Sequence, residues 1–233
     1  MSNSFWRALV CLCALCCPSA ARAQARNQLW ANGVIDWLAS DRLSANLDVE
    51  GQTNPGLVKA TPHVDYAIVP WADVLAEVQF EHESDSDTTT TPRFGAQFHI
   101  LSRLLHAHAH QGADREKPPL RRLVVSSLLR AENASSAWRL RDRFDAAYPL
   151  NRHKTTDDGA VYAMSDAELF MPLERAPGDA RVSEVRIRSG IGYRQNFTWR
   201  FEALYVWDGT RHAGTGALTT HARAIDIRVR REF

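Results

Sequence analysis

AIDIRVRREF, residues 224–233, alternates apolar and polar side chains up to a phenylalanine at its last position. Successive side chains of a β-strand point to opposite faces, so this stretch would have one apolar and one charged face. The apolar face would carry Ile225, Ile227, Val229 and Phe233. The charged face would carry Asp226, Arg228 and Arg230. Because chain ends usually fray, a strand that runs to the last residue indicates an end paired within a sheet.

The same period-two alternation recurs along the chain, in runs of about ten residues separated by turn-like pieces. The clearest runs are 42–51, 72–83, 92–100, 138–148, 184–194 and 198–208. We count eleven strand-like segments and find no long amphipathic helix and no break in composition. The pattern predicts one all-β domain over residues 24–233.

The N-terminus has the pattern of a secretory signal peptide. One Arg precedes a short apolar run, and Ala21-Arg22-Ala23 forms a small-x-small cleavage site. We expect residues 1–23 to be cleaved off. All four cysteines lie within this segment, so the exported chain would have no disulfide, thiol nucleophile or thiolate metal site.

The bulk composition excludes two classes of protein. A formal net charge of +1 gives no overall bias towards nucleic acid. Past the N-terminus, no run of about 18 apolar residues is present, which excludes a helical membrane span. Membrane β-barrels have a weaker signal per segment and are not excluded by this test.

The charged and aromatic residues favour a membrane barrel over a two-sheet sandwich. The polar face of the strands is rich in Arg and Glu, as a closed lumen with crossed ion pairs requires. Trp138 and Tyr148 share a face ten residues apart. With a rise of about 3.4 Å per residue and a tilt near 45°, about 24 Å separates them along the membrane normal. Trp199 and Trp207 partly repeat this spacing, and Trp37 lies beside a turn.

We therefore expect a single antiparallel transmembrane β-barrel of about 10–12 strands with a polar, charged lumen. Bacterial single-chain barrels have even strand numbers, so ten or twelve strands are both open. Either residues 28–37 do not form a full strand, or a long polar piece hides another strand.

Four short motifs, in this order, resemble an uncharacterised bacterial outer-membrane family that is known as a domain of unknown function, DUF2490. They are LRAEN (129–133), WRLRDRFDAAYPL (138–150), DAELF (166–170) and RIRSGIGYR (186–194). The resemblance covers nearly the whole exported chain and implies a β-barrel in the outer membrane. It implies no activity.

One departure from the family pattern concerns the partner of Glu132. The family has a Glu-x-Arg pattern, whereas here Glu132-Asn133 is followed by Ala134. Glu132 must then pair with a cation on another strand.

The charged residues of the expected lumen face form what we call the charge ladder. Its members are Arg130, Glu132, Arg139, Arg141, Arg143, Glu168, Arg186, Arg188, Arg200, Glu202, Arg228 and Arg230. Buried charges must be paired and hydrogen-bonded, so the ladder favours a structural plug of interlocked ion pairs. The alternative is a narrow pore or solute site in which the excess of arginine selects anions.

Two other groups of residues are of types that could bind a metal ion or catalyse a reaction. In HAHAH, His106, His108 and His110 would share one face of a strand, and imidazoles are good metal ligands. No carboxylate accompanies them at a fixed spacing, so we assign no metal and no cofactor.

A lipid-trimming barrel enzyme would need a serine, a histidine and an acid or amide at the outer face. Ser126, Ser127, His99 and Glu132 are available, but no spacing links them. We assign no catalytic residue.

The sequence as a whole predicts a monomeric outer-membrane barrel with a structural or narrow-pore role. Its partners would be outer-membrane lipid and the barrel assembly machinery. The assembly signal would be the apolar face of the last strand: Phe233, Val229, Ile227 and Ile225. A barrel enzyme acting on envelope lipid and a soluble periplasmic β-sandwich or lipocalin-like binder are the alternatives.

Overall fold

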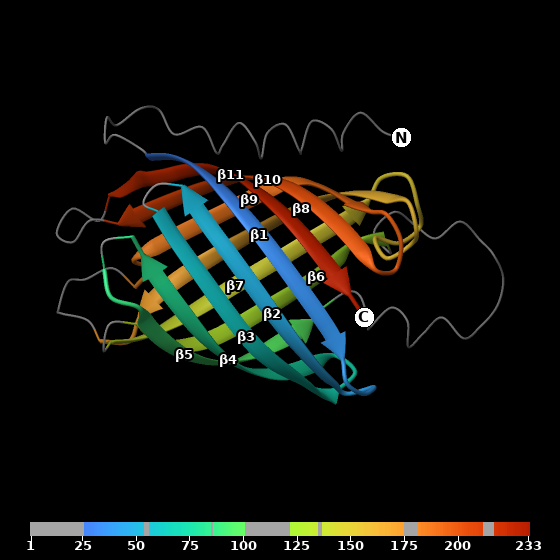
Figure 1. Cartoon of the computed structure of the whole chain (residues 1–233), viewed down its shortest axis with the longest axis horizontal. Coiled ribbons are helices and arrows are strands. Elements are labelled where there is room, and N and C mark those ends of the chain that lie inside the picture. Colours follow the sequence, from blue (N-terminus) through green and yellow to red (C-terminus); the bar gives the residue numbers. More distant parts are fainter. Residues whose placement is uncertain are drawn as a thin grey trace.

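In the computed structural model, the strands form one closed barrel (Figure 1). The structure describes residues 26–53, 56–84, 86–100, 122–134, 137–174, 181–211 and 217–233. Within these ranges lie eleven strands: β1 (Arg26–Leu38), β2 (Leu43–Thr53), β3 (Gly56–Val69), β4 (Ala72–Glu83), β5 (Thr89–His99), β6 (Val124–Ala134), β7 (Ala137–Pro149), β8 (Ala160–Pro172), β9 (Glu184–Arg194), β10 (Trp199–Arg211) and β11 (Leu218–Glu232). The predicted signal peptide lies outside the described residues.

Each strand pairs with the next in antiparallel register, and β1 closes the barrel by pairing with β11 in parallel. The all-β class and the closed barrel are confirmed. The expectation of an even, purely antiparallel barrel is wrong, because eleven strands are present in the described part of the chain. In a chain that reverses at every turn, the first and last of an odd number of strands point the same way, so only parallel pairing can close the barrel.

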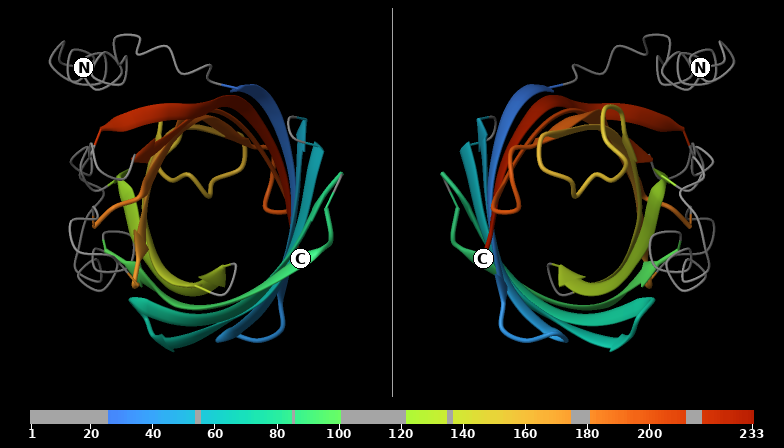
Figure 2. Two further views of the ribbon diagram at one scale, coloured as in Figure 1. Left: turned by 90° about the vertical axis from the view of Figure 1, so that its left-hand side faces the viewer. Right: turned by 90° about the vertical axis from the view of Figure 1, so that its right-hand side faces the viewer.

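The segment that could have removed the odd strand is itself a full strand. Residues 28–37 lie within β1, which pairs along its length from Arg26↔Ala222 to Asp36↔Glu232. The two-sheet sandwich is also excluded, because one continuous ring of strands surrounds the interior (Figure 2). We call the β1–β11 contact the closing seam.

The strand faces have the reverse of the polarity found in water-soluble proteins. Large apolar side chains such as Ile35, Phe94 and Ile191 are exposed on the outer face. Most of the buried polar side chains of the lumen are charged, and Glu132, Glu168 and Asp226 have no exposed surface. Trp30, Val206 and Ala224 form a small apolar cluster inside the barrel. No helix in the described ranges is long and apolar enough to cross a membrane.

The two mouths of the barrel carry different connections. At the mouth where β11 ends, which we call the C-terminal rim, lie the connections 39–42, 70–71, 150–159 and 195–198. The β7–β8 connection (150–159) is tied down by Asn151, whose side-chain amide donates to the carbonyl of Gly159 and whose Oδ1 accepts from the amide of Val161. This yellow segment lies across part of the mouth when the barrel is viewed along its axis (Figure 2).

Candidate functional site

All twelve residues of the charge ladder have side chains in the lumen, and each takes part in at least one ion pair. The alternation places them there, because every inward residue of a strand is followed by an outward one. The ladder therefore forms a network rather than a set of isolated charges.

Glu168 on β8 is the most heavily paired carboxylate of the network. Its oxygens lie 2.5 Å from Arg141 Nε and 3.7 Å from nitrogens of both Arg186 and Arg188. Arg130 Nη2 lies 3.5 Å away. A fully buried carboxylate is tolerated only where such partners replace its lost hydration.

Glu132 on β6 is the second fully buried carboxylate. It accepts a hydrogen bond from Arg139 Nε on β7, and its other oxygen lies 2.8 Å from Arg93 Nε on β5. Arg141 Nη1 is 3.8 Å from it. Glu132 therefore finds its cations on neighbouring strands.

Three guanidinium groups of the network lie against one aromatic ring. Phe170, also on β8, is 2% exposed, and the guanidinium carbons of Arg139 and Arg141 each lie 4.9 Å from its ring centre. Arg186 lies over the same ring at 5.4 Å. The negative face of the ring favours cations at these distances, which lets three arginines share one region of the lumen.

Further carboxylates pair with arginines of β9 and β11. Asp166 accepts from Arg188 Nε at 2.7 Å, and Asp208 from Arg186 Nη2 at 2.9 Å. Asp226 lies 2.7 Å from Arg228 Nη2.

Several members of the network were absent from the sequence-derived ladder. They include Glu77, Arg93, Asp166, Arg194, Asp208, Asp226 and Glu232. All have the strand parity of the lumen face. Alternation alone therefore places them in the lumen, whereas their ion-pair partners depend on which strands are neighbours.

The ion pairs follow the wall of the barrel. Among the described residues, each lumen pair joins residues on the same strand, on neighbouring strands or on strands one apart. Arg130 on β6 and Glu77 on β4 pair at 2.8 Å across one intervening strand, which is the largest number of strands that any of these pairs spans. The network thus lines the lumen and leaves a cavity of about 490 Å³ beside it.

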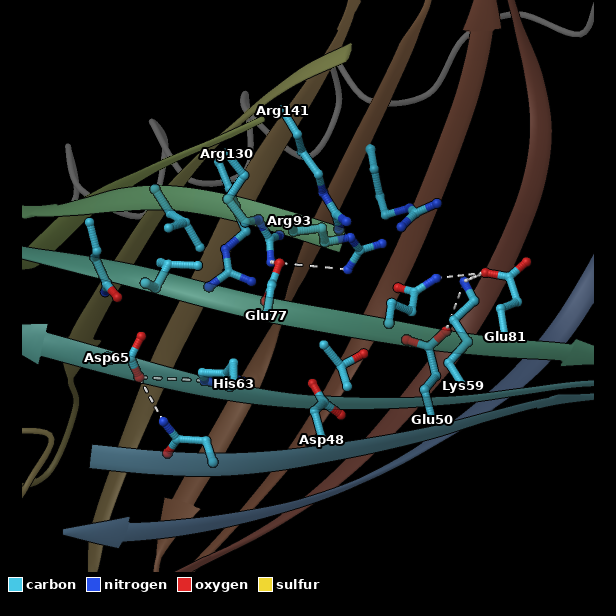
Figure 3. A pocket seen from close by; sticks show the side chains of 18 of the residues that line it. Asp48, Glu50, Lys59, His63, Asp65, Glu77, Glu81, Arg93, Arg130 and Arg141 are labelled. Carbon is cyan, nitrogen blue, oxygen red and sulfur yellow. Dashed lines mark hydrogen bonds and ion pairs between the residues drawn. The ribbon is translucent and has the colours of Figure 1, made fainter. Parts of the chain in front are cut away.

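The cavity has an acidic and a basic wall (Figure 3). Its lining carboxylates on β1–β4 are Asp36, Asp48, Glu50, Asp65, Glu77 and Glu81. Its lining arginines on β5–β9 are Arg93, Arg130, Arg139, Arg141, Arg143, Arg186 and Arg188. Only Lys59 on the acidic side and Glu184 on the basic side depart from this division among the described lining residues of these strands. The separation creates a field directed across the barrel.

The candidate serine and histidine residues are divided between the two faces. His99 and Ser126 lie opposite each other on β5 and β6 and face the lumen, where His99 Nε2 is 2.6 Å from Asp73 Oδ2. Ser127 faces outward and donates to Asp142 Oδ1 at 3.2 Å. Among the described residues, no hydrogen bond joins Ser126 to His99.

No group of three or more His, Cys, Asp or Glu residues suited to a metal ion occurs among the described residues. His106, His108 and His110 lie outside the described residues.

The last strand presents its apolar face outward. Ile225, Ile227 and Phe233 are exposed there, and Val229 shares their face. The backbone of Phe233 continues the closing seam, since its amide donates to the carbonyl of Asp36 at 3.0 Å.

Arg231 shares this outward face, and two rings flank it. Its guanidinium carbon lies 5.2 Å from the ring centre of Trp199 and 4.3 Å from that of Phe233. The two rings supply the cation with partners on an otherwise apolar face.

Comparison with known proteins identifies one family. The sequence model of a protein of unknown function, DUF2490, matches residues 22–218. No curated protein matches the chain.

Proposed function

The chain belongs to the DUF2490 family of proteins of unknown function, and from this premise we propose that it is an outer-membrane β-barrel whose lumen passes small polar solutes. The observation that carries the proposal is the reversed polarity of the barrel, with charged residues inside and apolar residues outside. In water, such a largely apolar exterior would drive association; in a bilayer it would meet lipid.

The dimensions of the strands support this location. The strands are 11 to 15 residues long, and a tilted membrane-spanning strand needs about 9–11 residues. Trp138 and Tyr148 lie near opposite ends of the outward face of β7, and Trp199 and Trp207 do so on β10. These are the positions of aromatic girdles in outer-membrane barrels.

The cavity favours passage over a structural plug. A plug requires ion pairs that cross the lumen, whereas the pairs described here stay on the wall. The remaining volume, about 490 Å³, lies within the range of about 300–1,000 Å³ that is usual for small-molecule sites.

Export and assembly would follow from the two ends of the chain. Residues 1–23 would direct the chain through the inner membrane. The outward residues Ile225, Ile227, Val229 and Phe233 would present the closing strand to the barrel assembly machinery. The folded barrel would act as a monomer surrounded by outer-membrane lipid.

Cell fractionation with heat-modifiability on a denaturing gel tests the location. A folded barrel should appear in the outer-membrane fraction and migrate differently before and after boiling. Recovery as a soluble periplasmic protein would overturn the proposal and favour a soluble binder.

Conductance in planar bilayers then tests the passage of solutes. We expect a small ohmic conductance that falls when the cavity is narrowed by Thr61→Trp, a polar residue that lines it. A barrel that inserts but stays electrically silent would favour the plug.

One observation favours a second candidate, a hydrolase. Asp73 lies 2.6 Å from His99 and orients its imidazole, and His99 on β5 is the register partner of Ser126 on β6. Because these residues face the lumen, the substrate would be a water-soluble ester that enters the barrel, not a lipid in the bilayer. Labelling by a fluorophosphonate probe that is lost in Ser126→Ala would support it, and an unlabelled wild-type barrel would exclude it.

A further inference from the structure

The acidic wall of the lumen contains a buried carboxylate oxygen that makes no hydrogen bond among the described residues. Glu50 and Glu81 share Lys59, at 3.5 and 3.7 Å, and Asp65 accepts from Asn46 at 2.6 Å. Asp48, between them on the wall, lines the cavity, yet its buried Oδ1 has no hydrogen-bond partner among the described residues. A buried carboxylate oxygen that lacks a hydrogen bond is stabilised when a ligand supplies a hydrogen-bond donor.

The lining arginines of the basic wall include buried donors that make no hydrogen bond among the described residues. Arg130 Nε and Arg188 Nη2 are buried and make no hydrogen bond among the described residues, although Arg188 Nη2 lies 3.7 Å from Glu168 Oε2 and other nitrogens of both side chains are paired. Both arginines line the cavity. An arginine has five N–H donors in a fixed plane, so a partly paired arginine can still bind a carboxylate.

The two unmatched sets lie on different walls of one cavity. Asp48 belongs to β2, whereas Arg130 and Arg188 belong to β6 and β9. A simple anion would satisfy the arginines and meet repulsion from the acidic wall. A simple cation would satisfy Asp48 and meet repulsion from the guanidinium groups.

We infer that the cavity binds small zwitterionic solutes, with the ammonium group at Asp48 and the carboxylate at Arg130 and Arg188. The inference rests on the proposed function in taking the cavity as the path of the solute, and it adds the chemical class of that solute. A molecule with opposite charges at its two ends matches the field across the barrel, and the charged lining disfavours apolar ligands.

Binding to the full-length folded barrel in detergent tests the inference without requiring a membrane. Isothermal titration calorimetry would compare 4-aminobutanoate and 6-aminohexanoate with butanoate and butylammonium. At least one zwitterion should bind about tenfold or more tightly than either singly charged compound, because a charge-assisted hydrogen bond is gained at the second end.

The variant Asp48→Asn should reduce the affinity for the zwitterion to about that for butanoate. Asp142→Asn is the matched control, because it removes a carboxylate from the outer face, and it should leave the affinities unchanged. Heat-modifiability would verify that each variant is folded. The comparison of ligands on the wild-type barrel remains decisive if a variant does not fold.

Three results would overturn the inference: equal affinity for butanoate and the zwitterions, retention of the preference in Asp48→Asn, or no binding of any compound. They leave the proposed location untouched. Conversely, zwitterion binding by a protein that fractionates as soluble would remove the outer-membrane proposal alone.

Discussion

At the scale of single residues, Glu168 holds together arginines that would otherwise repel one another. It is fully buried and lies within ion-pair distance of Arg141, Arg186 and Arg188. Glu168→Gln would keep the shape and remove the charge, leaving the guanidinium groups uncompensated. We expect a loss of about 3–5 kcal/mol in the free energy of unfolding, as for other broken buried pairs.

Urea titration of the detergent-solubilised barrel measures this loss. Glu83→Gln, at an exposed position on β4, removes the same charge and should change stability by no more than about 0.5 kcal/mol. Equal effects of the two substitutions would contradict the role assigned to Glu168.

Gly192 is required to be a glycine because the ring of Tyr162 lies close to its Cα. Tyr162 crosses over it, and a Cβ at position 192 would lie 2.1 Å from the tyrosine ring. The same tyrosine donates its hydroxyl to Glu202 Oε1 at 2.7 Å. Gly192→Ala must displace the ring and should destabilise the barrel by about 1–3 kcal/mol, as expected for overpacking.

The thermal unfolding midpoint in detergent measures the effect, and Gly33→Ala is its control. A Cβ at Gly33 meets no atom within 4 Å, so this variant should unfold at or slightly above the wild-type temperature. A midpoint for Gly192→Ala equal to that of Gly33→Ala would show that the ring moves without cost.

At the scale of elements, β11 combines the closing seam with the outward face that would direct assembly. Phe233 contributes its backbone to the seam and its ring to the contact with Arg231. Phe233→Ala keeps the backbone bonds and removes the cation–π contact, at a cost of about 0.5–1 kcal/mol. If the ring is also part of the assembly signal, the amount of folded barrel in the outer membrane should fall further than this loss of stability explains.

The folded fraction on unboiled gels, compared with the stability of refolded protein, separates the two effects. Phe197→Ala removes an exposed ring from the β9–β10 turn and serves as the control. A normal folded fraction for Phe233→Ala in cells would remove the terminal ring from the assembly signal.

The strands show how far the sequence determines the site. Alternation alone assigns Arg186, Arg188 and Glu168 to one face, because a strand has a strict two-residue period. It cannot assign partners. The three-way contact of Glu132 with β5 and β7 depends on which strands are neighbours and on their register.

The strand number could not be predicted for a different reason. The eleven alternating segments are all present as strands in the described residues, and only the rule of even parity argued against that number. The rule follows from all-antiparallel closure. The parallel pairing of β1 with β11, in which Leu29 faces Ile225 and Ala31 faces Ile227, removes its basis.

At the scale of the whole molecule, the odd number of strands separates the two ends of the barrel chain. β1 begins at the mouth opposite the C-terminal rim, where β11 ends. In a membrane, position 27 and the turn at Asp41 should lie on opposite sides, because β1 crosses once between them; if β1 did not cross, ten strands would remain, an even number. Single-cysteine variants can report this, because all four native cysteines lie in the predicted signal peptide.

We expect Asn27→Cys to react with a membrane-impermeant maleimide under the same conditions as Thr88→Cys, which lies in the β4–β5 connection at the same mouth. Asp41→Cys and Asn151→Cys, at the C-terminal rim, should react from the opposite side of the outer membrane. One pair of variants should therefore be labelled in intact cells, and the other pair only after the outer membrane is permeabilised. All four positions are exposed, so an absence of labelling in intact cells reports the side of the membrane and not burial. Joint labelling of positions 27 and 41 from one side would contradict the parallel seam, because it would mean that β1 does not cross the membrane beside β11.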